Sequence, residues 1–182
     1  MESQDHELVA RIVSHNDTQE FGELILRHQS HVRNFLRNLT GDTALADDLS
    51  QDCFLHAWDK LSTYSGHGTF IGWLLKVAYT TFLQSKRRSK RYAEILTEVG
   101  QVAEAESKSY TQANEEVTDL DKLLAILEEE ERAIMIMSYA CGLSHREIGA
   151  ATDMPVGTIK SVIHRSKEKI RSGFELKRYQ HG

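Results

Sequence analysis

Residues 142–171 read GLSHREIGAATDMPVGTIKSVIHRSKEKIR, and this stretch predicts two helices joined by a tight turn. Ser144, with Glu147 three residues later, forms a capping box that marks the start of a helix. Gly149 is less favourable than alanine inside a helix by about 1 kcal/mol, and we attribute it to a close crossing with the second helix. Asp153, Met154 and Pro155 form the turn, and proline is tolerated at the opening of the next helix.

The second helix of this pair is amphipathic, with an apolar back and a basic front. Its predicted buried stripe consists of Ile159, Ile163 and Ile170. The opposite face presents Gly157, Lys160, Ser161, His164 and Glu168, flanked by Arg165 and Lys167. Short and basic side chains on a helix that is held from behind suit the major groove of DNA. The pair is therefore interpreted as a helix-turn-helix that binds DNA sequence-specifically; an ordinary helix with a solvated charged face is the alternative.

The rest of the chain is predicted to be helical as well. Proline occurs once in 182 residues, and hydrophobic residues make up 40% of the chain, so a packed helical core is expected. We predict an all-α fold with two small helical domains. An N-terminal domain of three to four helices covers residues 1–92, an acidic flexible linker covers 93–119, and the helix-turn-helix domain covers 120–182.

Within the N-terminal domain, apolar residues recur at helical spacing over 20–39, and Gly41 ends that helix. Asp42 or Thr43 caps a second helix that runs to about residue 61, with predicted inward residues Leu45, Leu49, Phe54, Leu55 and Trp58. A loop over 62–69 leads to a third helix over 70–91, with inward residues Phe70, Leu74, Val77 and Ala78. Residues 120–141 predict two short helices broken near 128–131.

Charge is segregated along the chain, although the formal net charge is −5. Residues 71–93 contain six basic side chains and no acid, and residues 159–178 contain seven basic side chains against Glu168 and Glu175. The stretch 92–131 carries twelve acids against Lys108 and Lys122. Two basic blocks separated by an acidic segment indicate two surfaces for nucleic acid.

The predicted helix over 70–91 interleaves aromatic and basic side chains, namely Trp73, Lys76, Tyr79, Phe82, Lys86, Arg87 and Arg88. Aromatic rings stack unpaired bases, and basic groups follow phosphates. The run therefore favours nucleic acid as a partner. The alternative interpretation places Trp73 and Phe82 in the core and treats the basic run as a favourable helix end.

Other classes of protein are disfavoured. No stretch reaches the ~20 apolar residues of a membrane span, and the polar start lacks the features of a signal peptide. A cytoplasmic protein without membrane insertion is therefore expected. No nucleophile, base and orienting group occur together, which predicts that the protein is not an enzyme. Cys53 and Cys141 are expected to be small buried residues without a disulfide.

A metal site is a further alternative. The pairs His28 with His31 and Cys53 with His56 each place two potential ligands on one helical face. Such pairs arise often by chance, and Cys53 fits the core pattern. Neither a metal nor another cofactor is predicted, and metal analysis of the purified protein tests this.

Three stretches together resemble the extracytoplasmic function (group 4) sigma factors of bacterial RNA polymerase. ALADDLSQDCFLHAW (44–58) resembles the acidic helix with which that family docks on the polymerase. FIGWLLKVA (70–78), continued by the basic run, resembles the helix that recognises and melts the −10 element. LSHREIG (143–149) and PVGTIKS (155–161), followed by His164 and Arg165, resemble the helix-turn-helix that reads the −35 element.

The resemblance implies an alternative sigma factor that binds core RNA polymerase, at its β′ clamp helices and β flap, and promoter DNA. It assigns polymerase binding to Asp47, Asp48, Leu49, Gln51, Asp52, Phe54 and Trp58. It assigns the −10 element to Ser65, His67, Lys76, Tyr79, Thr80, Leu83, Lys86, Arg87 and Arg88, with the loop 62–69 around a flipped base. It assigns the −35 element to Lys160, Ser161, His164 and Arg165. An anti-sigma factor is a further partner that the family allows.

The chain departs from the family pattern at three positions. Thr80 stands where Asn is usual, Gln84 where an acid is frequent, and Val162 where Arg is frequent, which leaves the promoter sequence open. Two other interpretations also stay open. A stand-alone helix-turn-helix regulator would account for 142–171 only, and a sigma mimic that sequesters an anti-sigma factor would tend to lose the basic faces present here.

Overall fold

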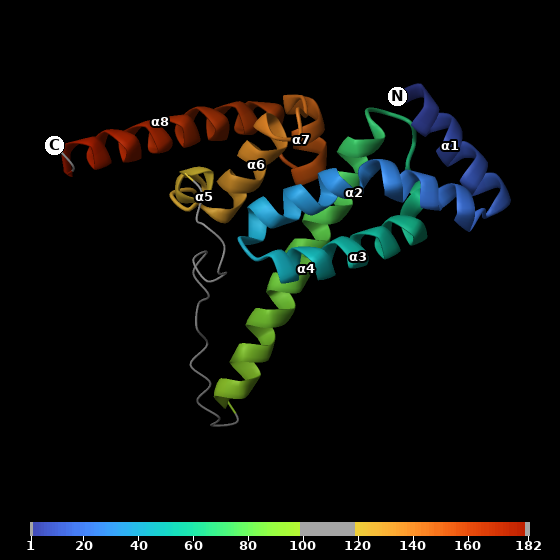
Figure 1. Ribbon diagram of the computed structural model, residues 1–182, viewed down its shortest axis with the longest axis horizontal. Helices are drawn as coiled ribbons and strands as arrows, with labels where there is room; N and C mark the ends of the chain where they lie inside the picture. Colours follow the sequence, from blue (N-terminus) through green and yellow to red (C-terminus); the bar gives the residue numbers. More distant parts are fainter. Residues whose placement is uncertain (1, 99–118, 181–182) are drawn as a thin grey trace.

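The computed structural model of the chain describes residues 2–98 and 119–180 (Figure 1). Within these residues every regular element is a helix, as predicted: α1 (Glu2–His15), α2 (Thr18–Thr40), α3 (Thr43–Lys60), the 3₁₀ turn η1 (Leu61–Thr63), α4 (Phe70–Glu98), α5 (Asp119–Leu124), α6 (Glu129–Tyr139), α7 (His145–Thr152) and α8 (Val156–Gln180). Most of the predicted linker, residues 99–118, lies outside the described residues.

Helices α1 to α4 form an N-terminal bundle in which α2 packs against the other three. The Asp17 carboxylate begins α2 by accepting hydrogen bonds from the backbone N–H groups of Gln19 and Glu20, at 2.8 and 3.1 Å. Gly41 ends α2 in the left-handed region, with φ of 69°. Asp42 then caps α3 by accepting from the Leu45 N–H at 3.0 Å. The predicted boundary between these two helices is confirmed.

Helix α1 is an element that the sequence pattern did not predict. It packs onto the bundle through three buried apolar side chains, Leu8, Val9 and Ile12. The Asp5 carboxylate, 4% exposed, accepts hydrogen bonds from Arg27 at 3.1 Å and from His28 at 3.0 Å. Burial lowers the pKa of His28 despite the opposing effect of Asp5. The residues at the start of the chain are mostly polar, so the short apolar stripe through which α1 packs is difficult to recognise in the sequence.

Helix α3 buries a different stripe from the predicted one. The buried residues are Ala46, Leu49, Cys53 and Ala57, whereas Leu45 and Leu55 are exposed. Small side chains at the contact allow α3 to lie close to its neighbours α2 and α4. The prediction that Leu45 and Leu55 point inward is therefore wrong. The prediction rests on the size of the apolar side chains, whereas the face of α3 that is buried carries mostly small side chains.

Helix α4 continues further than predicted. Residues 93–98, expected to belong to the linker, extend α4 to Glu98. Ala93, Glu94 and Leu96 are strong helix formers, and no glycine or proline intervenes before Gly100. Figure 1 shows the second half of α4 projecting away from the other helices.

Helices α5 to α8 form the C-terminal domain, and the predicted helix-turn-helix lies at α7 and α8. The capping box is present: Glu147 accepts from the Ser144 N–H at 2.9 Å, and the Ser144 hydroxyl accepts from the Glu147 N–H at 3.3 Å. Asp153 ends α7 with φ of 58°. A Cβ on Gly149 would lie 2.7 Å from the Met154 carbonyl oxygen. The close contact that requires this glycine is thus with the turn, while α8 lies slightly further away.

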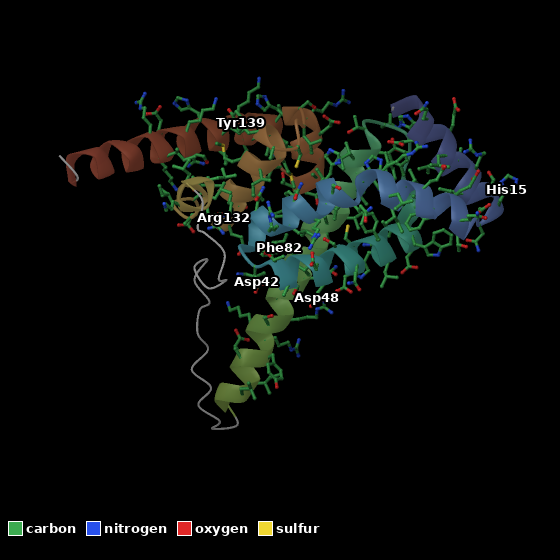
Figure 2. The ribbon with its side chains drawn as sticks, in the orientation of Figure 1. His15, Asp42, Asp48, Phe82, Arg132 and Tyr139 are labelled. Carbon is green, nitrogen blue, oxygen red and sulfur yellow. The ribbon has the colours of Figure 1, made fainter. Side chains whose placement is uncertain are left out.

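The C-terminal domain packs against the N-terminal bundle, and the buried apolar residues of both parts form one continuous core. Helix α7 lies along α4, and α6 lies against α2. Arg132, labelled in Figure 2, donates hydrogen bonds to the carbonyls of Leu124 and Leu127 at 3.0 and 3.1 Å. The same guanidinium donates to the Leu39 carbonyl at 3.4 Å. Arg132 therefore joins the ends of α5 and α2.

Candidate nucleic-acid interface

The outer face of α8 carries the four residues predicted to read the −35 element. Lys160, Ser161, His164 and Arg165 are all exposed. Behind them, four side chains are buried against α6 and α7, namely Ile159, Val162, Ile163 and Ser166. A basic face presented by an apolar back can enter a major groove without rearrangement of the domain.

The burial of Val162 accounts for one departure from the family pattern, the valine at a position where arginine is frequent. Its side chain is 3% exposed and belongs to the apolar back of α8. Ile170, the last residue of the predicted stripe, is half-buried against the core. The absence of arginine at position 162 therefore removes no residue from the exposed face of α8 in this arrangement.

The first half of α4 is covered by the C-terminal domain. Tyr79, predicted to lie beside a flipped base, is 6% exposed, and Thr80 and Leu83 are half-buried. Burial and the nearby carboxylates of Glu130 and Glu129 raise the pKa of Tyr79 to about 12. These side chains can reach a base only if the C-terminal domain moves away from α4.

Polar contacts hold α7 over the start of α4. The Glu147 carboxylate accepts hydrogen bonds from the Thr69 hydroxyl at 2.5 Å and from the Thr69 N–H at 3.4 Å. Burial alone would raise the pKa of Glu147, but hydrogen bonds from Thr69 and Ser144 outweigh it and lower that pKa. Lys76 donates to Asp153 at 2.7 Å. The first helix of the helix-turn-helix is thus bonded directly to the predicted −10 helix.

Other predicted −10 residues remain accessible. Lys86, Arg87 and Arg88 are exposed on the middle of α4, although Lys86 pairs with Glu129 at 3.0 Å. Ser65 and His67 are exposed in the loop before α4, with their side chains 3.1 Å apart. The structure therefore divides the predicted −10 set into an accessible group and a covered group formed by Tyr79, Thr80 and Leu83, while the partly exposed Lys76 pairs with Asp153.

The predicted polymerase-binding residues lie at different depths on α3. Asp48 and Gln51 are exposed, and Figure 2 labels Asp48. Four others are half-buried, namely Asp47, Asp52, Phe54 and Trp58. The Asp47 carboxylate accepts two hydrogen bonds from Arg33, one of them at 2.8 Å. Leu49 is 2% exposed and belongs to the core, so it cannot contact a partner in this arrangement.

Leu55 is a surface residue that the sequence pattern placed in the core. It is 65% exposed and follows Asp48 and Gln51 at helical spacing, so the three side chains share one face of α3. A large exposed apolar side chain between polar ones supplies an apolar contact to that face. The buried positions Ala46, Cys53 and Ala57 would have identified this face as outward.

Two family models match the chain, Sigma-70 region 2 over residues 24–92 and Sigma-70 region 4 over residues 118–170. The ECF RNA polymerase sigma factor SigE of Mycolicibacterium smegmatis is 33% identical over 153 residues, which cover 82% of this chain and 59% of that relative. The chain belongs to the extracytoplasmic function (ECF) sigma factors. It is an alternative sigma factor, a DNA-binding protein that directs the initiation of transcription by RNA polymerase.

Other comparisons span nearly the whole ECF sigma factor. The RNA polymerase sigma-H factor of Pseudomonas aeruginosa is 26% identical, with 93% of each chain covered. A solved structure of the sigma factor RpoE with the anti-sigma factor NepR from Bartonella quintana has a TM-score of 0.68 and 24% identity, and covers 87% of this chain and 98% of that one. The structure of CnrH with the cytosolic domain of CnrY has a TM-score of 0.69 and 21% identity, with 94% and 97% covered. These structures share the fold.

The family models coincide with the two predicted DNA-reading parts of this ECF sigma factor. Sigma-70 region 2 spans most of α2, all of α3 and most of α4, while Sigma-70 region 4 spans α5 to most of α8. Helix α1 precedes residue 24 and lies outside both models.

The four candidate metal ligands of this sigma factor, His28, His31, Cys53 and His56, lie in different surroundings. His28 contacts Asp5, and the His31 ring lies 6.4 Å from the His28 ring. His56 lies 3.0 Å from the Thr81 hydroxyl, and burial raises the pKa of Cys53 to about 12. The other cysteine, Cys141, is half-buried and not fully buried as predicted. Among residues 2–98 and 119–180, no three His, Cys, Asp or Glu side chains cluster as a metal site would require. None of the helices described is both long and apolar enough to cross a membrane.

Proposed function

We propose that this ECF sigma factor connects core RNA polymerase to promoters through three faces. The outer face of α8 reads the −35 element, the loop 62–69 and α4 bind and melt the −10 element, and the outward face of α3 docks on the polymerase. The observation that carries the proposal is the exposed basic front of α8 on its buried apolar back. The protein acts in the cytoplasm, needs no cofactor and leaves catalysis to the polymerase.

For the polymerase contact, the exposed face of α3 offers both charge and apolar area. Asp48 supplies an exposed carboxylate, Gln51 a hydrogen-bonding amide and Leu55 an apolar side chain. Basic groups on the polymerase clamp would complement the carboxylate. This face points away from α4 and α7, so docking there does not require the C-terminal domain to move.

Promoter binding requires the C-terminal domain to separate from α4. In the covered group Tyr79 is buried and Thr80 and Leu83 are half-buried, and α7 packs along α4. In the packed form, in which Glu147 bonds Thr69, Tyr79 is buried. We infer that polymerase, by holding the two domains apart, exposes the −10 face.

An anti-sigma factor is a further partner that we propose. One of the solved structures is a complex of the sigma factor RpoE with the anti-sigma factor NepR, and the other is a complex of CnrH with the cytosolic domain of CnrY. In this sigma factor the C-terminal domain packs against α4. An anti-sigma factor that binds this packed form would stabilise it.

Reconstitution with core RNA polymerase on a library randomised at both promoter elements tests the proposed function. We expect transcripts that start at defined sites and depend on both elements. DNA binding by the free protein, without polymerase-dependent starts, would instead indicate a stand-alone regulator. Polymerase binding without promoter selection would indicate that the basic faces have another role.

The α3 contact is tested separately by the double variant Asp48→Arg with Leu55→Ala. We expect its affinity for core polymerase to fall about tenfold, because both charge and apolar contact are removed. Glu7→Arg, an equal charge change at an exposed position of α1, is the control. An unchanged affinity in the double variant would remove α3 from the proposal.

A further inference from the structure

Helix α1 lies outside the matched family models, yet its first turns touch the loop that we propose receives a −10 base. The N-terminal end of α1 lies beside the segment that leads into α4 (Figure 1). His6 of α1 stacks on the Tyr64 ring, with centroids 5.4 Å apart and planes inclined by 12°. The His6 Nε2 atom lies 2.5 Å from the Tyr64 hydroxyl. Tyr64 is the first residue of the loop after the turn η1, so α1 holds one end of the irregular segment between η1 and α4.

The hydrogen bonds at Tyr64 define the role of His6. The Tyr64 hydroxyl donates to the Gly68 carbonyl at 3.0 Å. A phenol has a single hydrogen to donate, so the contact with His6 must be donated by Nε2–H and accepted by the hydroxyl oxygen. A chain of two bonds therefore runs from His6 through Tyr64 to Gly68, the other end of the loop.

The loop needs such a connection because its own backbone is permissive. Gly66 and Gly68 both adopt left-handed conformations, with φ of 74° and 86°, and glycines lose the most conformational freedom when they are ordered. The four residues 65–68 are exposed. The position of a Cβ on Gly66 would be 3.6 Å from His6 Cδ2, so the His6 ring packs directly under the turn.

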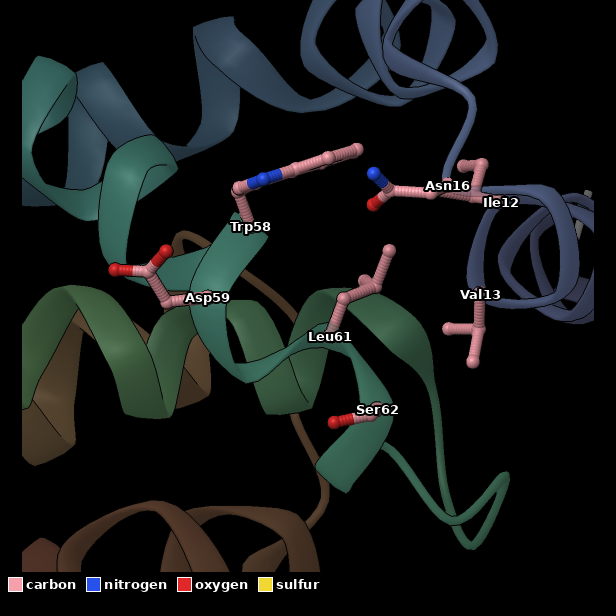
Figure 3. Close-up of a pocket in the computed structure, with 7 residues that line it drawn as sticks. All are labelled: Ile12, Val13, Asn16, Trp58, Asp59, Leu61 and Ser62. Carbon is pink, nitrogen blue, oxygen red and sulfur yellow. The ribbon is translucent and has the colours of Figure 1, made fainter.

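The other end of this connection is anchored in the core. The Tyr64 ring packs edge-on against Phe70 at 5.4 Å and lies 5.8 Å from Trp73, both on the first turns of α4. Helix α1 itself is fixed by its buried apolar residues and by Asp5. Figure 3 shows the same seam further along α1, where Ile12 and Val13 face Trp58 and Leu61 across a small cavity. His6 is thus carried by a rigid support.

We propose that His6 is a positioning residue for −10 recognition: it holds Tyr64, and through Tyr64 it keeps the loop 65–68 in the shape that receives an unpaired base. The inference rests on the proposed function of the loop. A base extruded from a strand is recognised by a pocket whose walls are already in place. Without the His6 contact, the loop would have to be ordered when the base binds, which weakens binding and selectivity together.

Three substitutions separate the parts of this connection. His6→Phe keeps an aromatic ring but removes the donor, and Tyr64→Phe removes the central hydroxyl while keeping the aromatic packing. His6→Gln restores an N–H donor without the ring. His15→Phe is the matched control, because His15 is also a histidine of α1 and its Nδ1 atom lies 3.0 Å from the Arg11 carbonyl oxygen of its own helix. Thermal unfolding verifies that each variant folds.

The readout is selectivity for each −10 base in holoenzyme, together with the fluorescence of 2-aminopurine placed at the position that responds to Ser65→Ala or His67→Ala. We expect His6→Phe and Tyr64→Phe to lower discrimination at that position about three- to tenfold and to reduce the fluorescence rise that reports an unstacked base. His6→Gln should recover most of the discrimination. Use of the −35 element and affinity for core polymerase should not change.

Failure of the inference and failure of the proposed function give different results. If no −10 position responds to loop substitutions in the otherwise native protein, the proposed role of the loop is wrong. If such a position exists but His6→Phe discriminates as the native protein does, His6 is not a positioning residue. Equal losses in His15→Phe, or uniform losses at all promoter positions, would also overturn the inference, because they would indicate a general effect of α1 on stability.

Discussion

Helices α4 and α8 both carry a basic face, but their surroundings differ. On α8 the predicted reading residues are exposed together, and the neighbours α6 and α7 lie behind them. On α4, against which α7 packs, Tyr79 is buried and Thr80 and Leu83 are half-buried, whereas Lys86, Arg87 and Arg88 are exposed. The same kind of charge pattern thus gives one proposed DNA-binding face that is open and one that is partly covered.

The contact chemistry explains the difference. Helix α7 and the turn after it present the acids Glu147 and Asp153, and these meet Thr69 and Lys76 of the −10 region. The polar front of α8 points the other way, and Lys167 at its side lies over the Tyr139 ring at 5.2 Å (Figure 2 labels Tyr139). Within the helix-turn-helix, α7 therefore packs against α4, while the polar face of α8 remains exposed.

The largest effect is expected on the open reader. Lys160→Ala and Arg165→Ala should each weaken use of the −35 element by about 1–3 kcal/mol if they contact bases. Transcription in holoenzyme from promoters with intact and scrambled −35 elements measures this. Lys167→Ala, at a basic position that packs on Tyr139, is the control. Equal losses on both promoters would indicate that the residues do not read sequence.

A smaller effect is expected on the covered reader. Glu147→Gln should weaken the contact between α7 and Thr69 by about 1 kcal/mol, because a charge-assisted hydrogen bond at a partly exposed site becomes a neutral one. Spin labels at positions 55 and 161 would measure the fraction of separated domains. Burial raises the pKa of the native thiols Cys53 and Cys141 to about 12 and about 11, so they should react slowly with the label.

Acidification should have the same effect as Glu147→Gln in the native protein. The hydrogen bonds from Thr69, which form only when the domains pack, help to lower the pKa of Glu147 below 4.5. Their contribution to packing is therefore present above pH 4.5 and is lost as the pH falls through the lowered value. The separated fraction should therefore rise below pH 4.5. Glu147→Gln should lack this component, while Glu168→Gln, whose pair with Arg171 lies within α8, should retain it. A separated fraction that falls on acidification would contradict the assignment.

The smallest effect is expected for Asp153→Asn. The Lys76–Asp153 pair is 2.7 Å long but largely exposed, so its loss should cost only about 0.2–1 kcal/mol. The contact should also weaken with added salt, whose screening length is about 10 Å at 0.1 M. The same spin-label distances, recorded with and without salt, should show less salt dependence in Asp153→Asn. A larger change than that of Glu147→Gln would reverse the order proposed for the two contacts.

Much of the fold could be predicted because it depends on neighbouring residues. The caps at Asp42 and Ser144, the end of α2 at Gly41 and the inward stripe of α8 all follow from chemistry within one or two helical turns. Two predictions fail for different reasons. The apolar stripe of helix α1 is too short for the sequence pattern to predict the helix, and the packing of α3 buries small side chains instead of the larger Leu45 and Leu55.

The sequence predicted which types of residue form the site, but it did not predict which of those residues are exposed. Family resemblance named Tyr79 and Leu49 among contact residues, yet both are buried here, and it omitted Leu55. His6 could not have been found, because nothing within a few residues of it indicates a contact with Tyr64, 58 positions later.

Residue order alone therefore determines where the helices begin and end, where charge concentrates, and that α8 has one apolar and one basic face. These properties arise from interactions over a few residues. The tertiary structure decides which of the basic faces is open, because that depends on pairs such as Thr69 with Glu147, 78 positions apart. Such contacts form only when α7 packs on α4, and no local periodicity encodes them.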